Sequence, residues 1–199
     1  DTSSADDYIL SMPLSDLVRA LEPPPPGAVR QAAELLTYRD LLIVLLIVDK
    51  PDIFPDHWIY IHDPKVSVGR IANPRNWSLD MIPDQEKTGL VLDYFCSEGD
   101  NLWNCSEEDL LHLARSELEQ LGIARTGSVI DGHVVRVPRA YPILDAEYKA
   151  QTLIIRQELS RISNLHLAGR NGMHKYNNQD HSMLTGIMAA RAANGESVD

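Results

Sequence analysis

The sequence predicts an α+β fold built on a mixed, mainly antiparallel sheet with flanking helices. The 199-residue chain contains one uninterrupted apolar run, Leu41–Val48, which is too short to cross a membrane and suits a central strand. Alternating segments around an Asp-Pro-Lys turn, over residues 58–73, predict a hairpin. A capped segment with leucines at helical spacing, over residues 106–121, predicts a long helix.

The first third of the chain predicts two short helices between two strands. Tyr8–Met12 is apolar and stops at Pro13, as expected for a buried strand that leads into a helix. That helix is expected over Leu14–Leu21, and the prolines at 23–26 end it. A second helix is expected over Ala28–Leu36, followed by the central strand described above.

The middle of the chain predicts the hairpin, a further strand and the most regular helix. The hairpin strands are expected over Trp58–His62 and Val66–Asn73. Thr88–Cys96 alternates between two faces and predicts another strand. Ser106 is expected to cap a helix that ends near Leu121, because an acidic residue follows at the third helical position.

The last third of the chain predicts a strand and helix followed by a strand–loop–helix unit. Ser128–Val137 is expected to form a strand that ends at Pro138. Asp145 is expected to cap a helix that continues to about Ile162. The remaining expected elements are a short strand over Asn164–Ala168, a loop over Gly169–Asn178 and a helix over Gln179–Ala193.

Composition argues against several classes of partner and location. The net charge of −11 opposes binding to nucleic acid or anionic membrane surfaces, because both need a cationic face. No apolar run approaches the roughly 20 residues that span a bilayer. The two cysteines, Cys96 and Cys105, form no CxxC pair or disulfide framework, which favours a reducing, cytoplasmic location. The chain starts at Asp1 without a signal-like leader and soon enters a strand-like segment, so we expect a fragment of a longer protein.

The segment Gly169–Met183 predicts a ligand-binding junction between a strand and a helix. Gly169 and Gly172 allow close backbone approach or positive φ, and Arg170 offers a planar donor fork for phosphate. The helix expected from Gln179 directs its positive end to the same place. An ordinary strand–loop–helix turn is the alternative, but the order of these residues favours a phosphorylated cofactor.

The same region resembles the C-terminal flavin-binding region of FAD-dependent oxidoreductases. The resemblance rests on Tyr141-Pro142, Asn164–Gly172 and Tyr176–Met183, and it is to the amine-oxidase and protoporphyrinogen-oxidase-like superfamily, which includes UDP-galactopyranose mutases. It implies that Gly169 and Arg170 lie along the FAD chain. The residues that it implies near the isoalloxazine ring are Asn178, Gln179, Asp180, His181, Ser182 and Met183. A helix N-terminus there would stabilise negative charge on the reduced ring.

The resemblance also implies a division into domains. Residues 14–150 would form a substrate-binding domain, and residues 1–13 and 151–199 would belong to an FAD-binding, Rossmann-like domain. No G-x-G-x-x-G motif occurs in the chain, so the N-terminal half of that domain, which holds the FAD pyrophosphate, is expected to be missing. We therefore expect FAD binding by the full-length protein, and weak or no binding by these residues alone.

The reaction implied by the resemblance is hydride transfer from a small-molecule substrate to flavin N5. The aromatic and cationic residues predicted to bind the substrate are Tyr60, Arg70, Trp77 and Arg139, with sheet packing as the alternative role for the hairpin residues. In the related mutases the reduced flavin attacks a sugar anomeric carbon, and arginines and tyrosines hold the diphosphate. Tyr60, Arg70 and Arg139 would then bind a nucleotide sugar. A non-catalytic binding or assembly fragment is the third alternative. Assembly into a homo-oligomer is compatible with each of these alternatives.

Other kinds of chemistry have little support in the sequence. His174 and His181 bracket the polar segment, but no third ligand accompanies them at metal-site spacing, so no metal is expected. The serines lack a nucleophile elbow and the cysteines lack a catalytic context, which disfavours hydrolase chemistry. No side chain is assigned as a catalytic acid or base.

Overall fold

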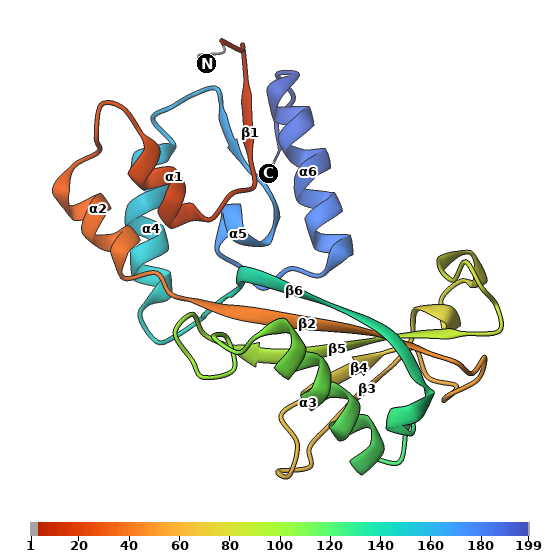
Figure 1. Cartoon of the computed structure of the whole chain (residues 1–199). Coiled ribbons are helices and arrows are strands. Elements are labelled where there is room, and N and C mark those ends of the chain that lie inside the picture. The colour runs from red at the N-terminus through yellow and green to blue at the C-terminus, as the bar shows by residue number, and fades with distance from the viewer. Residues whose placement is uncertain (1–3, 199) are drawn as a thin grey trace. The chain divides into compact units, whose positions relative to one another are not determined.

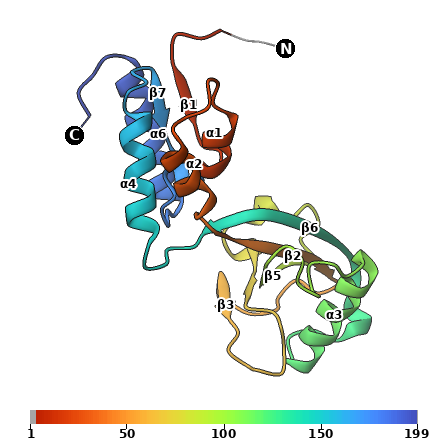
Figure 2. The same cartoon turned by 90° about the vertical axis from the view of Figure 1, so that its left-hand side faces the viewer.

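The chain folds into two compact units, and the computed structural model describes residues 4–198. The terminal unit takes in the chain up to Tyr38 and again from Tyr141 onward, whereas the sheet unit is Arg39–Ala140. Figures 1 and 2 show the elements of both units from two directions. Residues 1–3 and 199, which the expected flavin-domain segments include, lie outside the described residues.

A five-stranded sheet of order β3-β4-β5-β2-β6 forms the sheet unit (Figure 1). Its strands are β2 (Tyr38–Val48), β3 (Trp58–Tyr60), β4 (Arg70–Ala72), β5 (Thr88–Cys96) and β6 (Val129–Pro142). The short 3-10 helices are η1 (Pro74–Asn76), η2 (Leu79–Met81) and η3 (Thr126–Ser128). β2 pairs with β5 from Asp40 opposite Cys96 to Val48 opposite Thr88, and this pairing is antiparallel, as are β3–β4 and β4–β5. The predicted mainly antiparallel sheet is confirmed.

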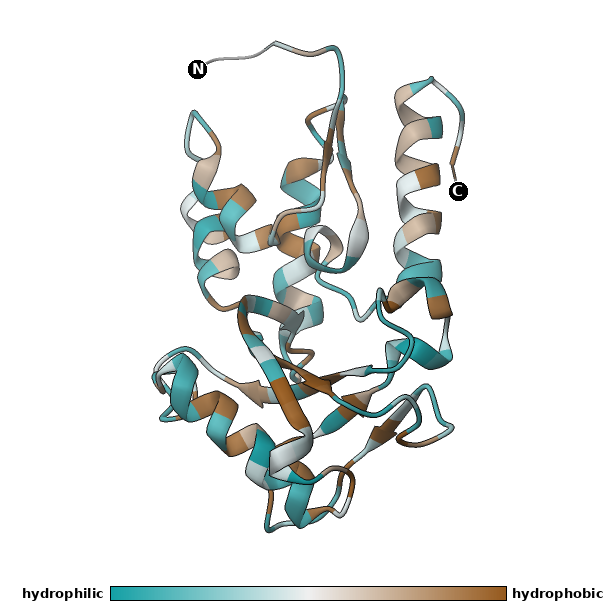
Figure 3. Ribbon diagram, turned by 45° about the vertical axis from the view of Figure 1, so that its right-hand side comes forward, coloured by the Kyte–Doolittle hydropathy of each residue, from teal (hydrophilic) through white to brown (hydrophobic). Residues whose placement is uncertain are grey.

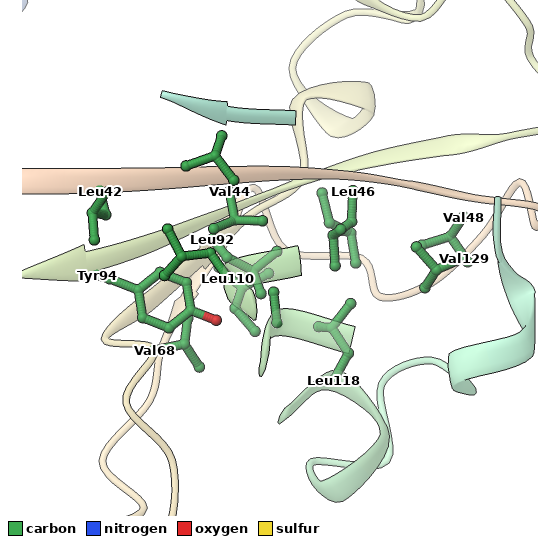
Figure 4. Close-up of a cluster of buried hydrophobic side chains, with 14 of the residues drawn as sticks. Leu42, Val44, Leu46, Val48, Val68, Leu92, Tyr94, Leu110, Leu118 and Val129 are labelled. Carbon is green, nitrogen blue, oxygen red and sulfur yellow. The ribbon is translucent and has the colours of Figure 1, made fainter. Parts of the chain in front are cut away.

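One face of this sheet packs against α3 (Glu107–Gln120) to form the core of the unit. Leu42 and Leu46 of β2 are fully buried against Leu110 and Leu118 of α3 (Figure 4). Each such side chain contributes roughly 1.5–3 kcal/mol relative to an exposed position. Hydrophobic and hydrophilic residues alternate along α3 in Figure 3, as its leucine spacing predicts. Ser106 caps the helix as expected, because its hydroxyl accepts the N–H of Asp109.

A buried carboxylate, Glu117, ties α3 to the segment between β3 and β4. Glu117 is only 4% exposed. It accepts hydrogen bonds from the N–H groups of Ser67 and Val68, at 2.5 and 3.2 Å, and from the hydroxyl of Tyr94 at 2.9 Å. Three donors therefore compensate for burying this charge.

The terminal unit combines a two-stranded parallel sheet with helices. Its strands are β1 (Tyr8–Leu10) and β7 (Leu165–Leu167), and Tyr8 lies opposite Leu165. Its helices are α1 (Leu14–Ala20), α2 (Gly27–Glu34), α4 (Tyr148–Leu159), α5 (Gly169–Met173) and α6 (Gln179–Ala193). Buried Leu14, Ala32 and Ile155 bring α1, α2 and α4 into one core.

The expected buried strand over Tyr8–Met12 is shorter and more exposed than predicted. β1 ends at Leu10, and Tyr8 and Ile9 are 40% and 47% exposed. Within the described residues β1 has only β7 as a strand neighbour, and so small a sheet cannot bury both faces. The expected helix over 145–162 is also shorter, because Asp145 accepts the N–H groups of Glu147 and Tyr148 in a turn that precedes α4.

The strand expected to end at Pro138 continues to Pro142 as β6. β6 is an edge strand among the described strands, where a proline without an N–H is tolerated. Arg139, the residue after Pro138, has a φ of 54°. Its N–H donates to the buried carboxylate of Asp40 at 2.6 Å. Asp40 also accepts the N–H of Glu98, so one side chain holds two distant backbone segments.

The chain passes from one compact unit to the other near residues 38 and 140, and α1 and α2 pack with α4 in the terminal unit. The substrate-binding domain was predicted over residues 14–150. Which part binds a cofactor or substrate stays a prediction. Across residues 4–198, none of the helices has the length and apolar character needed to cross a membrane.

Candidate functional site

The segment between β7 and α6 holds the residues predicted to bind a flavin. Gly169 has φ of +72°, a left-handed conformation that favours glycine. α5 replaces the first half of the loop expected over Gly169–Asn178. The N–H of Gly169 donates to Oγ1 of Thr185 at 2.9 Å, which ties the turn after β7 to α6. The structure therefore brings the two ends of this predicted site together.

Gly172 has a packing role in the same segment. A Cβ built at this position would lie 2.5 Å from the carbonyl oxygen of Leu10 and 3.1 Å from Cα of Ser11. α5 thus approaches the backbone that leaves β1 more closely than any other residue type allows. The close backbone approach expected of this glycine is a contact with the chain itself.

Arg170 is held in a fixed orientation beside two tyrosines. Its Nε and Nη2 atoms donate to the carbonyl oxygen of Asn177 at 2.9 and 2.6 Å. The guanidinium carbon lies 4.5 Å from the ring centroid of Tyr141 and 5.1 Å from that of Tyr176, and the two rings are nearly parallel at 16°. Both contacts are at cation–π distance. We call Tyr141, Arg170 and Tyr176 the arginine–tyrosine cluster.

The N-terminus of α6 follows directly after this cluster. Asn178 is its N-cap residue but makes no side-chain capping bond, so the first-turn N–H groups have no side-chain acceptor from that residue. Asn178, Gln179, Asp180 and His181 are exposed, Ser182 is partly buried and Met183 is 63% exposed. The His181 ring lies 3.1 Å from the carboxylate of Asp180. An open positive helix end beside an apolar side chain suits a flat ligand that carries negative charge.

Two of the predicted substrate residues lie together on the sheet. Tyr60 of β3 is opposite Arg70 of β4, and Arg70 is opposite Asp93 of β5. Arg70 forms an ion pair with Asp93, with Nε to Oδ2 at 2.6 Å. Burial raises the pKa of Asp93, and the Arg70 charge partly opposes this effect. The pair is on the sheet face opposite the core, because Ile71 and Leu92 face α3.

The other two predicted substrate residues lie elsewhere in the sheet unit. Trp77 follows η1, and its ring centroid is 6.0 Å from that of Trp58 and 6.1 Å from that of His57. Arg139 belongs to β6, three strand positions from β4, which corresponds to about 14 Å at the usual strand spacing. The four residues therefore do not form one cluster.

The structure gives no support for a metal site. Within residues 4–198, no group of three or more histidines, cysteines or carboxylates could hold a metal ion. His174 is fully buried, whereas His181 is exposed on α6. Cys96 and Cys105 are free thiols, and burial raises the pKa of Cys96, so its reactive thiolate is disfavoured.

Tyr141 and Tyr176 were not among the predicted site residues. Both lie in the segments that carry the family resemblance, so the available signal was an aromatic residue upstream of Arg170 and another downstream in the same loop. Their stacking depends on a turn formed by α5 and cannot be read from the residue order.

The family of flavin containing amine oxidoreductases matches residues 1–194 of the chain. The chain belongs to this family. The predicted membership of an amine-oxidase-like superfamily is thereby confirmed. No protein among the curated sequences matches the chain.

Two solved structures share the fold of this amine oxidoreductase family chain. Reduced UDP-galactopyranose mutase has a TM-score of 0.83 at 18% sequence identity, over 99% of this chain and 43% of that chain. The structure described as "Putative protoporphyrinogen oxidase" from Exiguobacterium sp. 255-15 has a TM-score of 0.64 at 18% identity, over 94% of this chain and 42% of that chain. This chain thus spans less than half the length of either protein.

Proposed function

We propose that this chain supplies part of an FAD site and part of a substrate-binding surface of a flavin-dependent oxidoreductase. The observation that carries the proposal is the exposed N-terminus of α6, without a side-chain cap, directly after the loop fixed by Arg170. Membership of a flavin-containing family supports the choice of cofactor. The terminal unit would hold the cofactor, and the sheet unit would bind the substrate.

The cofactor contacts are assigned by the chemistry of each group. Gly169 and Arg170 would lie along the FAD chain, where a guanidinium can bind phosphate oxygens. Residues 178–183 would lie near the isoalloxazine ring, since the α6 amides favour negative charge and Met183 offers an exposed apolar side chain. Bound FAD would supply a hydride acceptor. The side chains of this chain would orient it and stabilise its charge.

The substrate contacts are assigned to the open face of the sheet. Tyr60 and Trp77 have exposed aromatic rings in the same unit, and the ion pair with Asp93 fixes the guanidinium of Arg70 beside Tyr60. Such a combination suits a small molecule with an aromatic or anionic part. Arg139 lies across the sheet and would contact a different part of the substrate from Arg70.

The test is flavin binding by the purified protein that carries this chain, in the length that its reading frame encodes. We expect Arg170→Ala to weaken FAD binding by about tenfold or more, the equivalent of one charge-assisted hydrogen bond. Arg191→Ala, at the opposite end of α6, is the matched control and should leave binding unchanged. Absence of bound flavin, or equal losses in both variants, would contradict the proposal.

A mutase reaction on a nucleotide sugar is a second candidate, favoured by the position of Tyr60 directly opposite Arg70 on neighbouring strands. A guanidinium beside a phenol offers the cation and the hydroxyl donor that a diphosphate needs, and Arg139 would contact another part of the nucleotide sugar. Turnover of a nucleotide sugar without net redox change would support the mutase. Substrate-dependent bleaching of the flavin without oxygen would support the oxidoreductase. A protein that binds no flavin and shows neither reaction would instead be a non-catalytic binding fragment.

A further inference from the structure

A second concave site lies in the terminal unit, lined by α4 and the end of α5. The cavity has a volume of about 260 Å³. Its lining residues are Tyr148, Lys149, Thr152, Leu153, Arg156, His174 and Lys175. None of them belongs to the residues assigned above to the flavin or the substrate. The cavity is smaller than the roughly 300–1,000 Å³ of drug-sized sites, so it suits a small ligand.

The lining of this cavity is cationic in a strongly acidic chain. Lys149, Arg156 and Lys175 contribute positive charge and no carboxylate lines the cavity, although the chain as a whole carries −11. In the part of the chain that the structure describes, none of these three cations forms an ion pair. The two lysines are exposed and Arg156 is partly buried. Their charge is therefore available to an anionic ligand.

Two buried nitrogen atoms of the lining residues lack hydrogen-bond partners. His174 is 0% exposed, and its Nδ1 has no partner among residues 4–198, whereas Nε2 lies 3.3 Å from the carbonyl oxygen of Ile143. Nε of Arg156 is likewise without a partner there, although Nη2 donates to the carbonyl oxygen of Met173 at 2.6 Å. Buried polar atoms are normally paired. Because Nε2 of His174 must donate to the Ile143 carbonyl oxygen, Nδ1 of the neutral ring can only accept, whereas Nε of Arg156 is a donor. The unpaired N–H of Arg156 therefore indicates a ligand with an oxygen acceptor.

The remaining lining residues indicate what kind of ligand the cavity can hold. The ring of Tyr148 lies 6.4 Å from that of His174, and Leu153 adds an exposed apolar side chain. Thr152 uses its hydroxyl within α4, where it donates to the carbonyl oxygens of Tyr148 and Lys149. The cavity therefore offers a cationic part for oxygen atoms and an apolar part for a small carbon skeleton.

We propose that this cavity binds a small phosphomonoester, with the phosphate held by Lys149, Arg156 and Lys175 and the organic part packed against Tyr148 and Leu153. A dianion matches a cluster of three cations better than a carboxylate does. The phosphate oxygens would also give the unpaired Nε of Arg156 a hydrogen-bond acceptor. Burial lowers the pKa of His174, and a bound dianion would oppose that shift.

The test measures binding of phenyl phosphate by titration calorimetry to the purified protein that carries this chain, in the length that its reading frame encodes, with inorganic phosphate and benzoate as separate arms. We expect phenyl phosphate to bind most tightly, since benzoate lacks the second charge and phosphate lacks the ring. Lys149→Gln combined with Lys175→Gln should weaken binding by about tenfold or more, the loss of at least one charge-assisted hydrogen bond. Both lysines are exposed, so the variant should fold.

Lys50→Gln combined with Lys65→Gln is the matched control, because it removes the same charge at exposed positions outside the cavity. It should leave the affinity unchanged. Equal losses in the two double variants would overturn the proposal, because they would show a response to net charge alone. A loss in Arg170→Ala with none in Lys149→Gln/Lys175→Gln would also overturn it, because the anion would then bind at the proposed flavin site. Binding of inorganic phosphate and phenyl phosphate with equal affinity would refute the apolar part of the site.

Discussion

The buried carboxylate of Glu117 provides the sharpest test of what stabilises the sheet unit. Glu117→Ala would leave the N–H of Val68 and the hydroxyl of Tyr94 without their acceptor, in residues that are 2% and 0% exposed. The N–H of Ser67 would also lose its partner, but Ser67 is exposed and water can replace the carboxylate there. Two buried donors at about 1–3 kcal/mol each predict a loss of about 2–6 kcal/mol in the free energy of unfolding.

The measurement is urea unfolding followed by tryptophan fluorescence. All three tryptophans, Trp58, Trp77 and Trp103, lie in the sheet unit, so the signal reports on that unit alone. With a urea m-value of about 2 kcal/mol/M, the midpoint should fall by about 1–3 M. The matched control is Glu119→Ala, an exposed residue on the same helix, which should change the free energy of unfolding by less than about 1 kcal/mol.

Tyr94→Phe separates the contributions of the three hydrogen bonds to Glu117. It removes a single donor and leaves the carboxylate with both backbone partners, so we expect a loss of about 1–2 kcal/mol. A Glu117→Ala variant no less stable than Glu119→Ala would refute the reasoning, because the carboxylate would then contribute no more than a surface group.

Three further perturbations test other parts of the structure. Gly172→Ala places a Cβ 2.5 Å from the Leu10 carbonyl oxygen and should destabilise the terminal unit by about 1–3 kcal/mol in thermal unfolding, whereas Gly186→Ala, with open space around it, should be neutral or stabilising. Asp40→Ala removes the acceptor of two backbone N–H groups and should cost about 2–4 kcal/mol by urea unfolding; a loss below about 1 kcal/mol would contradict this role. Burial lowers the pKa of His174 below its ordinary value of 6.5, so the unfolded chain takes up this proton first as the pH falls. The stability contributed by neutral His174 should be fully present above pH 6.5 and decline below it, and unfolding at several pH values should show a weaker decline for His174→Gln.

The regular elements of the sheet unit followed from local patterns. The limits of β5 match the predicted strand Thr88–Cys96, and Ser106 caps α3 as its spacing indicated. These features depend on neighbours in sequence: alternation in a strand, and a hydroxyl reaching an N–H three residues later. The extension of β6 beyond Pro138 depended instead on the position of that strand at a sheet edge.

The predicted cofactor residues came together because they lie in one short stretch of chain. Gly169, Arg170 and residues 178–183 flank a single turn of backbone, so any compact fold keeps them close. The predicted substrate residues come from separate strands and a loop after η1. Only the order of strands decided that Tyr60 lies beside Arg70 while Arg139 lies across the sheet.

By itself, the sequence determined the class of the fold, the family and the stretch that resembles a flavin site. Each of these follows from periodicities or motifs whose residues lie close together along the chain. Tertiary structure decided the stacking of Tyr141 on Arg170 and Tyr176, the partners of Glu117, and the gathering of Lys149, Arg156 and Lys175 around one cavity. These contacts join segments whose separation is set by folding of the whole unit. Side-chain periodicity reports which face of an element is buried, but it does not report what that face meets.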